Sequence, residues 1–165
     1  MMDTFWNKHA FLTEAYIDSI LTGETDSFVI LEQLFSNKNV IDSVWSLYLK
    51  PENHDNATHL LKLHIRKTVD MINSILKRGR LNPSTTLSMS IHKSSGDLLA
   101  KALTEGANVT CAEKLLRKQS EILVTLTVAK MRKEDNVKIA ELRRMYYDII
   151  KDLKNACIVT ILTKS

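Results

Sequence analysis

The chain has few residues that break helices and few that build common chemical sites. Its 165 residues include only 4 glycines and 2 prolines, which favours long helices joined by short turns. Its 2 cysteines are too few for a disulfide framework and lack the spacing of a zinc site. The sequence also contains no glycine-rich phosphate loop and no His-Glu-x-x-His or Glu-x-x-His metal motif. An enzyme with a defined reaction is therefore the least favoured interpretation.

Long apolar segments are missing as well. No run approaches the roughly 20 apolar residues that a membrane span needs, and the N-terminus lacks the basic-then-apolar order of a signal peptide. We therefore expect a soluble, cytoplasmic protein. Hydrophobic residues make up 44% of the chain and charged residues 25%, values that are typical of one globular domain, here over residues 1–165.

The charge is uneven along the chain. Residues 1–50 carry 3 Lys and Arg against 7 Asp and Glu, a net charge of −4, whereas residues 51–165 carry 20 against 12, a net charge of +8. A basic face can bind nucleic acid, but glutamates interrupt these basic residues, and the aromatic residues of this half are limited to Tyr146 and Tyr147. The pattern gives no specific signal for nucleic acid and is more typical of a solvated helix surface.

One segment of the chain occurs twice. When Phe5–Leu21 is shifted by 55 residues onto Leu60–Leu76, 6 of 17 positions are identical, against about 1 expected for unrelated stretches. A second shift reaches Leu115–Met131, where the match is weaker. This spacing predicts an all-α, up-and-down bundle of about six helices, built from helical-hairpin repeats of about 55 residues near 1–55, 56–110 and 111–165.

Capping and breaking residues predict where these helices end. Gly23 would end the first helix in the left-handed conformation that glycine accepts. Pro51–Asn56 would be a loop, and the helix after Pro83 would have a weak or bent middle because it is rich in Ser, Thr and Gly. The remaining expectations are one bent element over 27–49 with a break near 37–39, and a cap of the last helix at Asp135 or Asn136.

Two histidines lie within the apolar stripe of the repeated helix, because residues three and four apart share a helix face. The first stripe contains Trp6, His9, Thr13, Ile17 and Ile20, and its copy contains Leu61, His64, Thr68, Ile72 and Ile75. Polar residues such as Glu14 fall elsewhere on the helix. Parallel helices in one register place equivalent residues at one depth, so we expect His9, His64 and Gln119 to meet in the core. The hydroxyls of Thr13 and Thr68, or water, would complete their hydrogen bonds.

Two classes of function remain. In the first, the protein is a non-catalytic binding or assembly module whose inward-facing histidines satisfy each other or backbone groups. In the second, the bundle binds a metal or a small ligand through His9 and His64. We favour the first class because buried histidines are more often structural, and two imidazoles with Gln119 make a poor metal site. We expect no tightly bound cofactor.

The last helix carries apolar residues beyond its main stripe. They exceed what one face of a bundle requires, so the sequence suggests a homodimer through this helix. The residues concerned are Tyr147, Ile150, Ile158, Ile161 and Leu162.

Three motifs in the first half of the chain carry a family resemblance. They are Trp-x-x-His-x-x-x-Thr at Trp6, His9 and Thr13; a Leu, Asn, Ile and Tyr pattern at Leu34, Asn37, Ile41 and Tyr48; and Leu-Leu-x-x-His-Ile from Leu60 to Ile65. In these motifs the chain resembles an uncharacterised bacterial family of small all-helical proteins. The family also has a Trp followed by an Asn, and then a third His followed by a Thr, where this chain has His92, Ser95, Gln119 and Leu123. The resemblance implies a helical domain with important histidine sites, and these departures put a shared three-histidine chemistry in doubt.

Overall fold

The structure is a computed structural model that describes residues 2–24, 26–36, 49–77, 83–104 and 109–162. Within these ranges, side chains are described from residue 5 to residue 155. In this part of the chain it contains six α-helices and no β-strand. They are α1 (Met2–Thr22), α2 (Ser27–Ser36), α4 (Pro51–Leu76), α5 (Pro83–Thr104), α6 (Val109–Met131) and α7 (Asn136–Leu162). The predicted all-α bundle is confirmed, whereas its origin in a 55-residue repeat stays a prediction.

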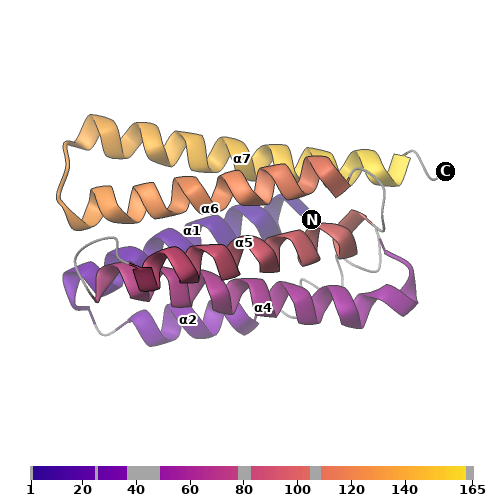
Figure 1. The fold of residues 1–165 in the computed structure, drawn as a ribbon, viewed down its shortest axis with the longest axis horizontal. Coiled ribbons are helices and arrows are strands. Elements are labelled where there is room, and N and C mark those ends of the chain that lie inside the picture. Colours follow the sequence, from indigo (N-terminus) through magenta and orange to yellow (C-terminus); the bar gives the residue numbers. More distant parts are fainter. Residues whose placement is uncertain (1, 25, 37–48, 78–82, 105–108, 163–165) are drawn as a thin grey trace.

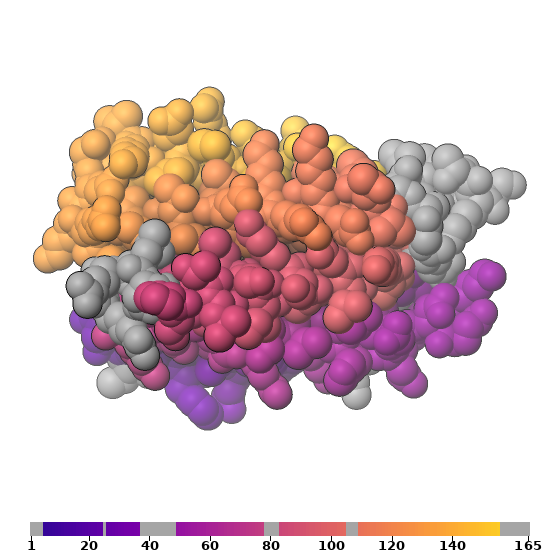
Figure 2. Space-filling model, viewed as in Figure 1, coloured from indigo at the N-terminus to yellow at the C-terminus, as the bar shows by residue number. Residues whose placement is uncertain are grey.

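The long helices pack side by side with their axes nearly aligned (Figure 1). α4 packs against α5, α5 against α6 and α6 against α7, and α1 closes the bundle by contacting both α7 and α4. Figure 2 shows that α4, α5 and α6 together cover the near face of the molecule. The short α2 lies against α1 and α4. α1, α4 and α6 are mutual neighbours, which is the arrangement that the expected meeting of His9, His64 and Gln119 requires.

The helix ends follow the capping residues with one correction. Gly23 has a φ of 72°, and the N–H of Glu24 donates to the carbonyl of Ser19 at 3.1 Å, so the predicted left-handed end of α1 is confirmed. Asp135 caps α7, since its Oδ1 accepts a backbone N–H hydrogen bond of 2.9 Å. The prediction of a loop over Pro51–Asn56 is wrong. These residues begin α4, because proline is well tolerated at the first helical position, where its missing N–H breaks no helical hydrogen bond.

Several expectations fall on residues that the structure does not describe. The break expected near 37–39 lies outside the described residues, as do the family-motif residues Asn37, Ile41 and Tyr48.

Within the described ranges, no helix has the length and apolarity that crossing a membrane would require.

The predicted stripes lie in the core with one exception. Nine of their ten residues are buried, but Ile20, in the last turn of α1, is 37% exposed. On α5 the buried face differs from the apolar one that the spacing suggests. Leu87, Ile91 and Leu98 are 62%, 40% and 47% exposed, whereas His92 is fully buried. α5 therefore turns a face of small and polar residues toward its neighbours.

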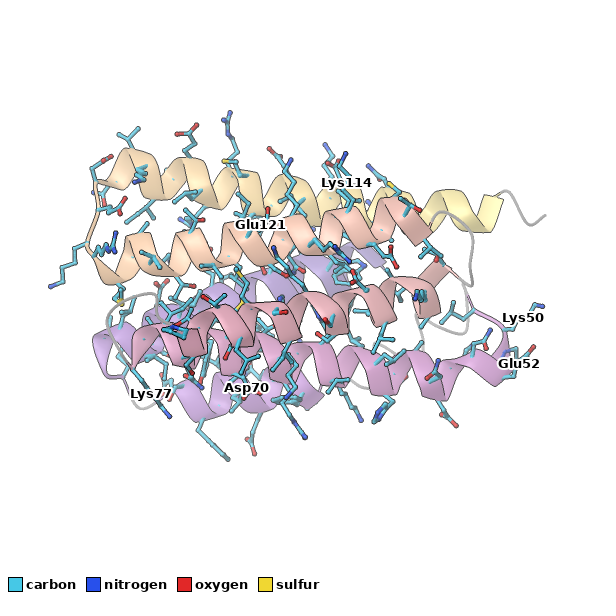
Figure 3. All side chains as sticks on the ribbon, in the orientation of Figure 1. Lys50, Glu52, Asp70, Lys77, Lys114 and Glu121 are labelled. Atoms are coloured by element: carbon cyan, nitrogen blue, oxygen red, sulfur yellow. The ribbon has the colours of Figure 1, made fainter. Side chains whose placement is uncertain are left out.

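Charged residues of the basic half form ion pairs on the surface of the bundle. Lys93 Nζ on α5 lies 2.7 Å from Glu121 Oε1 on α6, and Arg117 Nη2 lies 2.7 Å from Asp97 Oδ2. Figure 3 shows Glu121 on α6 together with Lys114. Glutamate and aspartate therefore neutralise part of the positive charge on this face.

Candidate functional site

The residues that the sequence predicts for the polar core are all buried, and none of them is more than 3% exposed. They are Trp6, His9 and Thr13 on α1, His64 and Thr68 on α4, and Gln119 on α6. Side chains of this polarity cost free energy in a core unless they are hydrogen-bonded. The partners of each polar atom therefore decide what the site can do.

His64 on α4 has one ring nitrogen paired and one without a partner. Its Nδ1 lies 3.0 Å from Ser95 Oγ on α5. Its Nε2 is buried and has no hydrogen-bond partner among the described residues. Gly96 lets α5 and α6 approach closely beside the ring, because a Cβ at that position would lie only 3.2 Å from the Cβ of Leu116 and in ordinary contact, at 3.5 Å, with His64 Cε1.

Ser95 assigns the tautomer of His64. Its hydroxyl lies 2.7 Å from the carbonyl oxygen of His92, closer than it lies to the imidazole, so we assign its one proton to that carbonyl. The Ser95 oxygen then accepts the hydrogen bond from His64 Nδ1–H. Because a neutral imidazole carries only one N–H, Nε2 of His64 holds a lone pair. The site thus contains a buried basic nitrogen that is free to accept a hydrogen bond.

His92 is a core histidine that the sequence analysis did not include in the site. Its Nε2 lies 2.8 Å from Thr68 Oγ1 and its Nδ1 lies 2.6 Å from Ser120 Oγ. Its ring stacks on that of His64, with centroids 4.3 Å apart and planes at 27°. Both ring nitrogens of His92 are hydrogen-bonded to hydroxyls, so His92 has a structural role in the core. The ring nitrogen without a partner belongs to His64.

A signal for this missed residue was present in the sequence. His92, Ser95 and Gly96 are spaced three and four residues apart, as are Leu99 and Leu103 that continue the same face of α5. All five are buried. Sequence reasoning detects a face of this kind only if it counts small and polar residues, as well as apolar ones, as possible core residues.

His9 on α1 is enclosed by aromatic rings. Phe5 stacks on it at a centroid distance of 6.2 Å with planes at 16°, and Trp6 meets it edge-on at 6.2 Å and 84°. The hydroxyl of Thr13 donates to the carbonyl of His9 at 2.8 Å, and Thr68 makes the same bond to the carbonyl of His64 at 2.9 Å. Both threonine hydroxyls thus donate to the backbone carbonyl one turn earlier in their own helix.

Tyr146 on α7 also lies in this part of the core. Burial raises the pKa of its phenol, and the nearby side chains of Gln119 and Thr13 oppose this rise. Gln119 also lies near His64, where it favours the protonated ring. Neither Tyr146 Oη nor Gln119 Oε1 has a partner with hydrogen-bond geometry among the described residues. Three buried polar atoms, one each from α4, α6 and α7, are therefore left unpaired in the same part of the core.

Burial keeps the three histidines neutral. Desolvation, with the charge of His64 second, lowers the pKa of His9 from 6.5 to about 3, and desolvation lowers that of His64 to about 4. The pKa of His92 lies well below 6.5 for the same reason, and repulsion from His64 and His9 lowers it further. The charge of His64 thus acts on both other rings, and the rings of His64 and His92 are in direct contact.

The described residues contain no group of three or more His, Cys, Asp or Glu side chains that could hold a metal ion. Since His92 uses both ring nitrogens on hydroxyls, only His9 and His64 of the core histidines remain as candidate ligands. Zinc usually takes three or four protein ligands. The arrangement therefore fits a metal poorly.

An ion cluster lies on α1, one turn beyond His9. Glu14 falls outside the predicted stripe but is only 4% exposed. Its Oε1 lies 2.8 Å from Lys130 Nζ on α6 and 2.6 Å from Arg143 Nε on α7. Two cations from different helices neutralise this carboxylate, which makes its burial tolerable. The cluster ties α1 to the helices that carry Gln119 and Tyr146.

Fold and site together define an all-α bundle with a histidine-rich polar core. No protein-family model, no curated protein and no solved structure matches the chain. The resemblance to a bacterial helical family accordingly stays a hypothesis, and a function has to be argued from the core itself.

Proposed function

We propose that this protein is a non-catalytic binding module that takes a small, uncharged polar ligand into the core of its helical bundle. One observation carries the proposal: His64 Nε2, Gln119 Oε1 and Tyr146 Oη are buried without hydrogen-bond partners among the described residues. Buried polar atoms are nearly always hydrogen-bonded, and an unpaired one costs about 1–3 kcal/mol. A bound molecule that pairs with all three would remove this cost.

The three atoms define the chemistry of the ligand. The lone pair of His64 Nε2 and the amide oxygen of Gln119 each accept a hydrogen bond, and the Tyr146 hydroxyl can donate one. A complementary ligand therefore has N–H or O–H groups and an acceptor oxygen. It is uncharged, because the same burial that keeps His9 neutral would oppose a buried ionic ligand. A small primary amide meets these conditions.

Acetamide tests the proposal directly, with N,N-dimethylacetamide as a matched compound that lacks N–H donors. NMR of protein labelled with ¹⁵N in histidine distinguishes a ring nitrogen that carries a proton from one that holds a lone pair. We expect acetamide to shift the Nε2 resonance of His64 in a saturable way, and the dimethyl compound to leave it unchanged. Equal responses to both compounds, or none, would contradict the proposal.

A variant pair separates binding in the core from effects at the surface. Gln119→Leu removes one of the three polar atoms and should abolish the response to acetamide. Gln33→Leu makes the same change at an exposed position of α2 and should leave the response intact. If Gln119→Leu responds like the unmodified protein, the core polar groups pair with one another. The histidines would then serve only the stability of the module.

A further inference from the structure

A groove with a volume of about 380 Å³ lies on the surface between α4 and α5, apart from the polar core. The two helices pack against each other on the face of the molecule that Figure 2 shows. The volume falls within the range for small-molecule sites. Each helix contributes three residues to the lining, which are Asn53, Asn56 and Leu60 on α4 and Leu98, Lys101 and Ala102 on α5.

The apolar part of the groove is open to solvent. Leu98 is 47% exposed. Leu60 and Ala102 pack on the core with one side and keep accessible surface on the other, since both are only half-buried. An apolar group that lies on these three side chains therefore covers surface that water otherwise contacts, and the free energy gained grows with the apolar area covered.

The accessible apolar surface continues along α5 beyond the groove. Leu87, Ile91 and Leu98 are four and seven residues apart, so they lie on one side of the helix, and each of them is 40% to 62% exposed. Because an α-helix rises about 1.5 Å per residue, Ile91 lies about 10 Å from Leu98 along the helix axis. A narrow apolar strip of this shape fits an extended alkyl chain.

The polar end of the groove is positively charged. Lys101 is exposed and forms no ion pair with another described residue. Asp97, one turn earlier on α5, accepts hydrogen bonds of 2.9 and 2.7 Å from Arg117 on α6, which directs its carboxylate away from this groove. Asn56 is exposed on α4 and adds an amide N–H donor. A cation and an amide donor on two different helices are complementary to a carboxylate.

We infer that this groove binds a free carboxylate with an unbranched alkyl chain, such as octanoate. The carboxylate accepts hydrogen bonds from the ammonium group of Lys101 and the amide of Asn56. The alkyl chain lies on Leu60 and Leu98 and extends toward Ile91. An alkylamine of the same length would bring its positive charge against Lys101, and a short carboxylate would leave the apolar strip uncovered. The groove therefore selects ligands that have both a negative head group and an alkyl chain.

Three probes test the head group and the chain separately. They are octanoate, butanoate, which is shorter by four CH₂ groups, and octylamine, which reverses the charge. A fully buried CH₂ group increases affinity about fourfold, and an open groove covers about half of it, so each CH₂ group should contribute about twofold.

Calorimetry and ¹⁵N NMR of the unmodified protein measure the binding. Octanoate should bind saturably and shift the amide resonances of residues 56–60 and 98–102. Butanoate should bind about sixteenfold more weakly, since four CH₂ groups contribute about twofold each, and octylamine should bind at least about tenfold more weakly.

Variants at exposed positions assign the contacts. Lys101→Glu should weaken octanoate binding at least about tenfold and strengthen octylamine binding, because it reverses the charge of the groove. Lys118→Glu, at an exposed lysine of α6, should change neither. Leu98→Asn should weaken octanoate binding about threefold or more, whereas Val137→Asn, at a 79% exposed position of α7, should leave it unchanged.

Four outcomes would overturn the inference. Equal affinities for octanoate and octylamine would identify a merely apolar surface, and equal affinities for octanoate and butanoate would identify a simple anion site. The absence of a saturable response to octanoate in both measurements would show that the groove does not bind such a ligand. A dimer mass in light scattering that Leu98→Asn converts to a monomer mass would show that a second copy of the chain covers the groove instead.

Discussion

Acidification tests the buried state of the core histidines. A histidine in an unfolded chain has a pKa near 6.5, whereas in the folded protein the pKa of His9 is about 3 and that of His64 about 4. Between these values the unfolded chain binds protons that the folded chain does not. The free energy of unfolding therefore rises with pH in this window, and stability is lost as the pH falls from 6.5 toward the folded pKa values.

The size of the effect follows from the shifts. At pH 5, which is about 1.5 units below the unfolded pKa, each of the two histidines lowers the free energy of unfolding by about 2 kcal/mol, or about 4 kcal/mol together. His92, whose pKa is lowered too, acts in the same direction. Domains of this kind are stable by about 5–15 kcal/mol in total, so acid at pH 5 should remove a large part of the stability.

Urea unfolding followed by circular dichroism at pH 7.5, 6.5 and 5 measures the effect. His9→Leu should reduce the loss between pH 7.5 and 5 by about 2 kcal/mol, since it removes one of the titrating rings. His59→Gln is a matched control, because His59 is exposed on α4 and its ring is hydrated in both states. If the free energy of unfolding of the unmodified protein were the same at pH 7.5 and 5, the histidines could not be buried as described.

Four further predictions follow from particular contacts. Gly96→Ala should cost about 1–3 kcal/mol in urea unfolding, because its Cβ would lie only 3.2 Å from the Cβ of Leu116 on α6. Ser94→Ala, on the exposed face of α5, should cost nothing. Ser95→Ala should move the proton of His64 from Nδ1 to Nε2, and an unchanged histidine NMR spectrum would refute our tautomer assignment. Purified protein should retain no stoichiometric transition metal in elemental analysis. The homodimer through the last helix stays a prediction that a monomer mass in light scattering would contradict; Ile150 is fully buried within the monomer, so the contact would rest on other apolar residues of α7.

The sequence was sufficient for the helices and for part of the core because both depend on local spacing. His9 and His64 lie among apolar residues three and four apart, and a helix places such residues on one face whatever its neighbours are. Gly23 ends α1 because few other residues accept a positive φ. The first turn of α4 was missed because Pro51 marks both loops and helix starts, and spacing alone does not separate the two.

The polar centre was less predictable, because it depends on which helices meet. Leu87 and Ile91 are large apolar residues in the first half of α5, and on an ordinary bundle helix they would face the core. Here His92 is turned inward instead, since Thr68 and Ser120 on the two neighbouring helices bond to its two ring nitrogens. Ser95 is also buried, and its hydroxyl donates to the carbonyl of His92. Each of these four residues alone is an unfavourable core residue, and only the assembled set satisfies their hydrogen bonds.

Tyr146 shows the same dependence on neighbouring helices at the proposed ligand site. Its place in the apolar stripe of α7 predicts that the ring is buried, but nothing in that stripe indicates what its hydroxyl meets. The hydroxyl lies near Gln119 and Thr13 because α7 packs between α1 and α6. The atoms that define the site thus come from three different helices, α4, α6 and α7. Ser95, which determines where His64 holds its lone pair, lies on a fourth helix, α5. A substitution such as Ser95→Ala therefore changes the chemistry of the site without touching any of the three atoms proposed to bind the ligand.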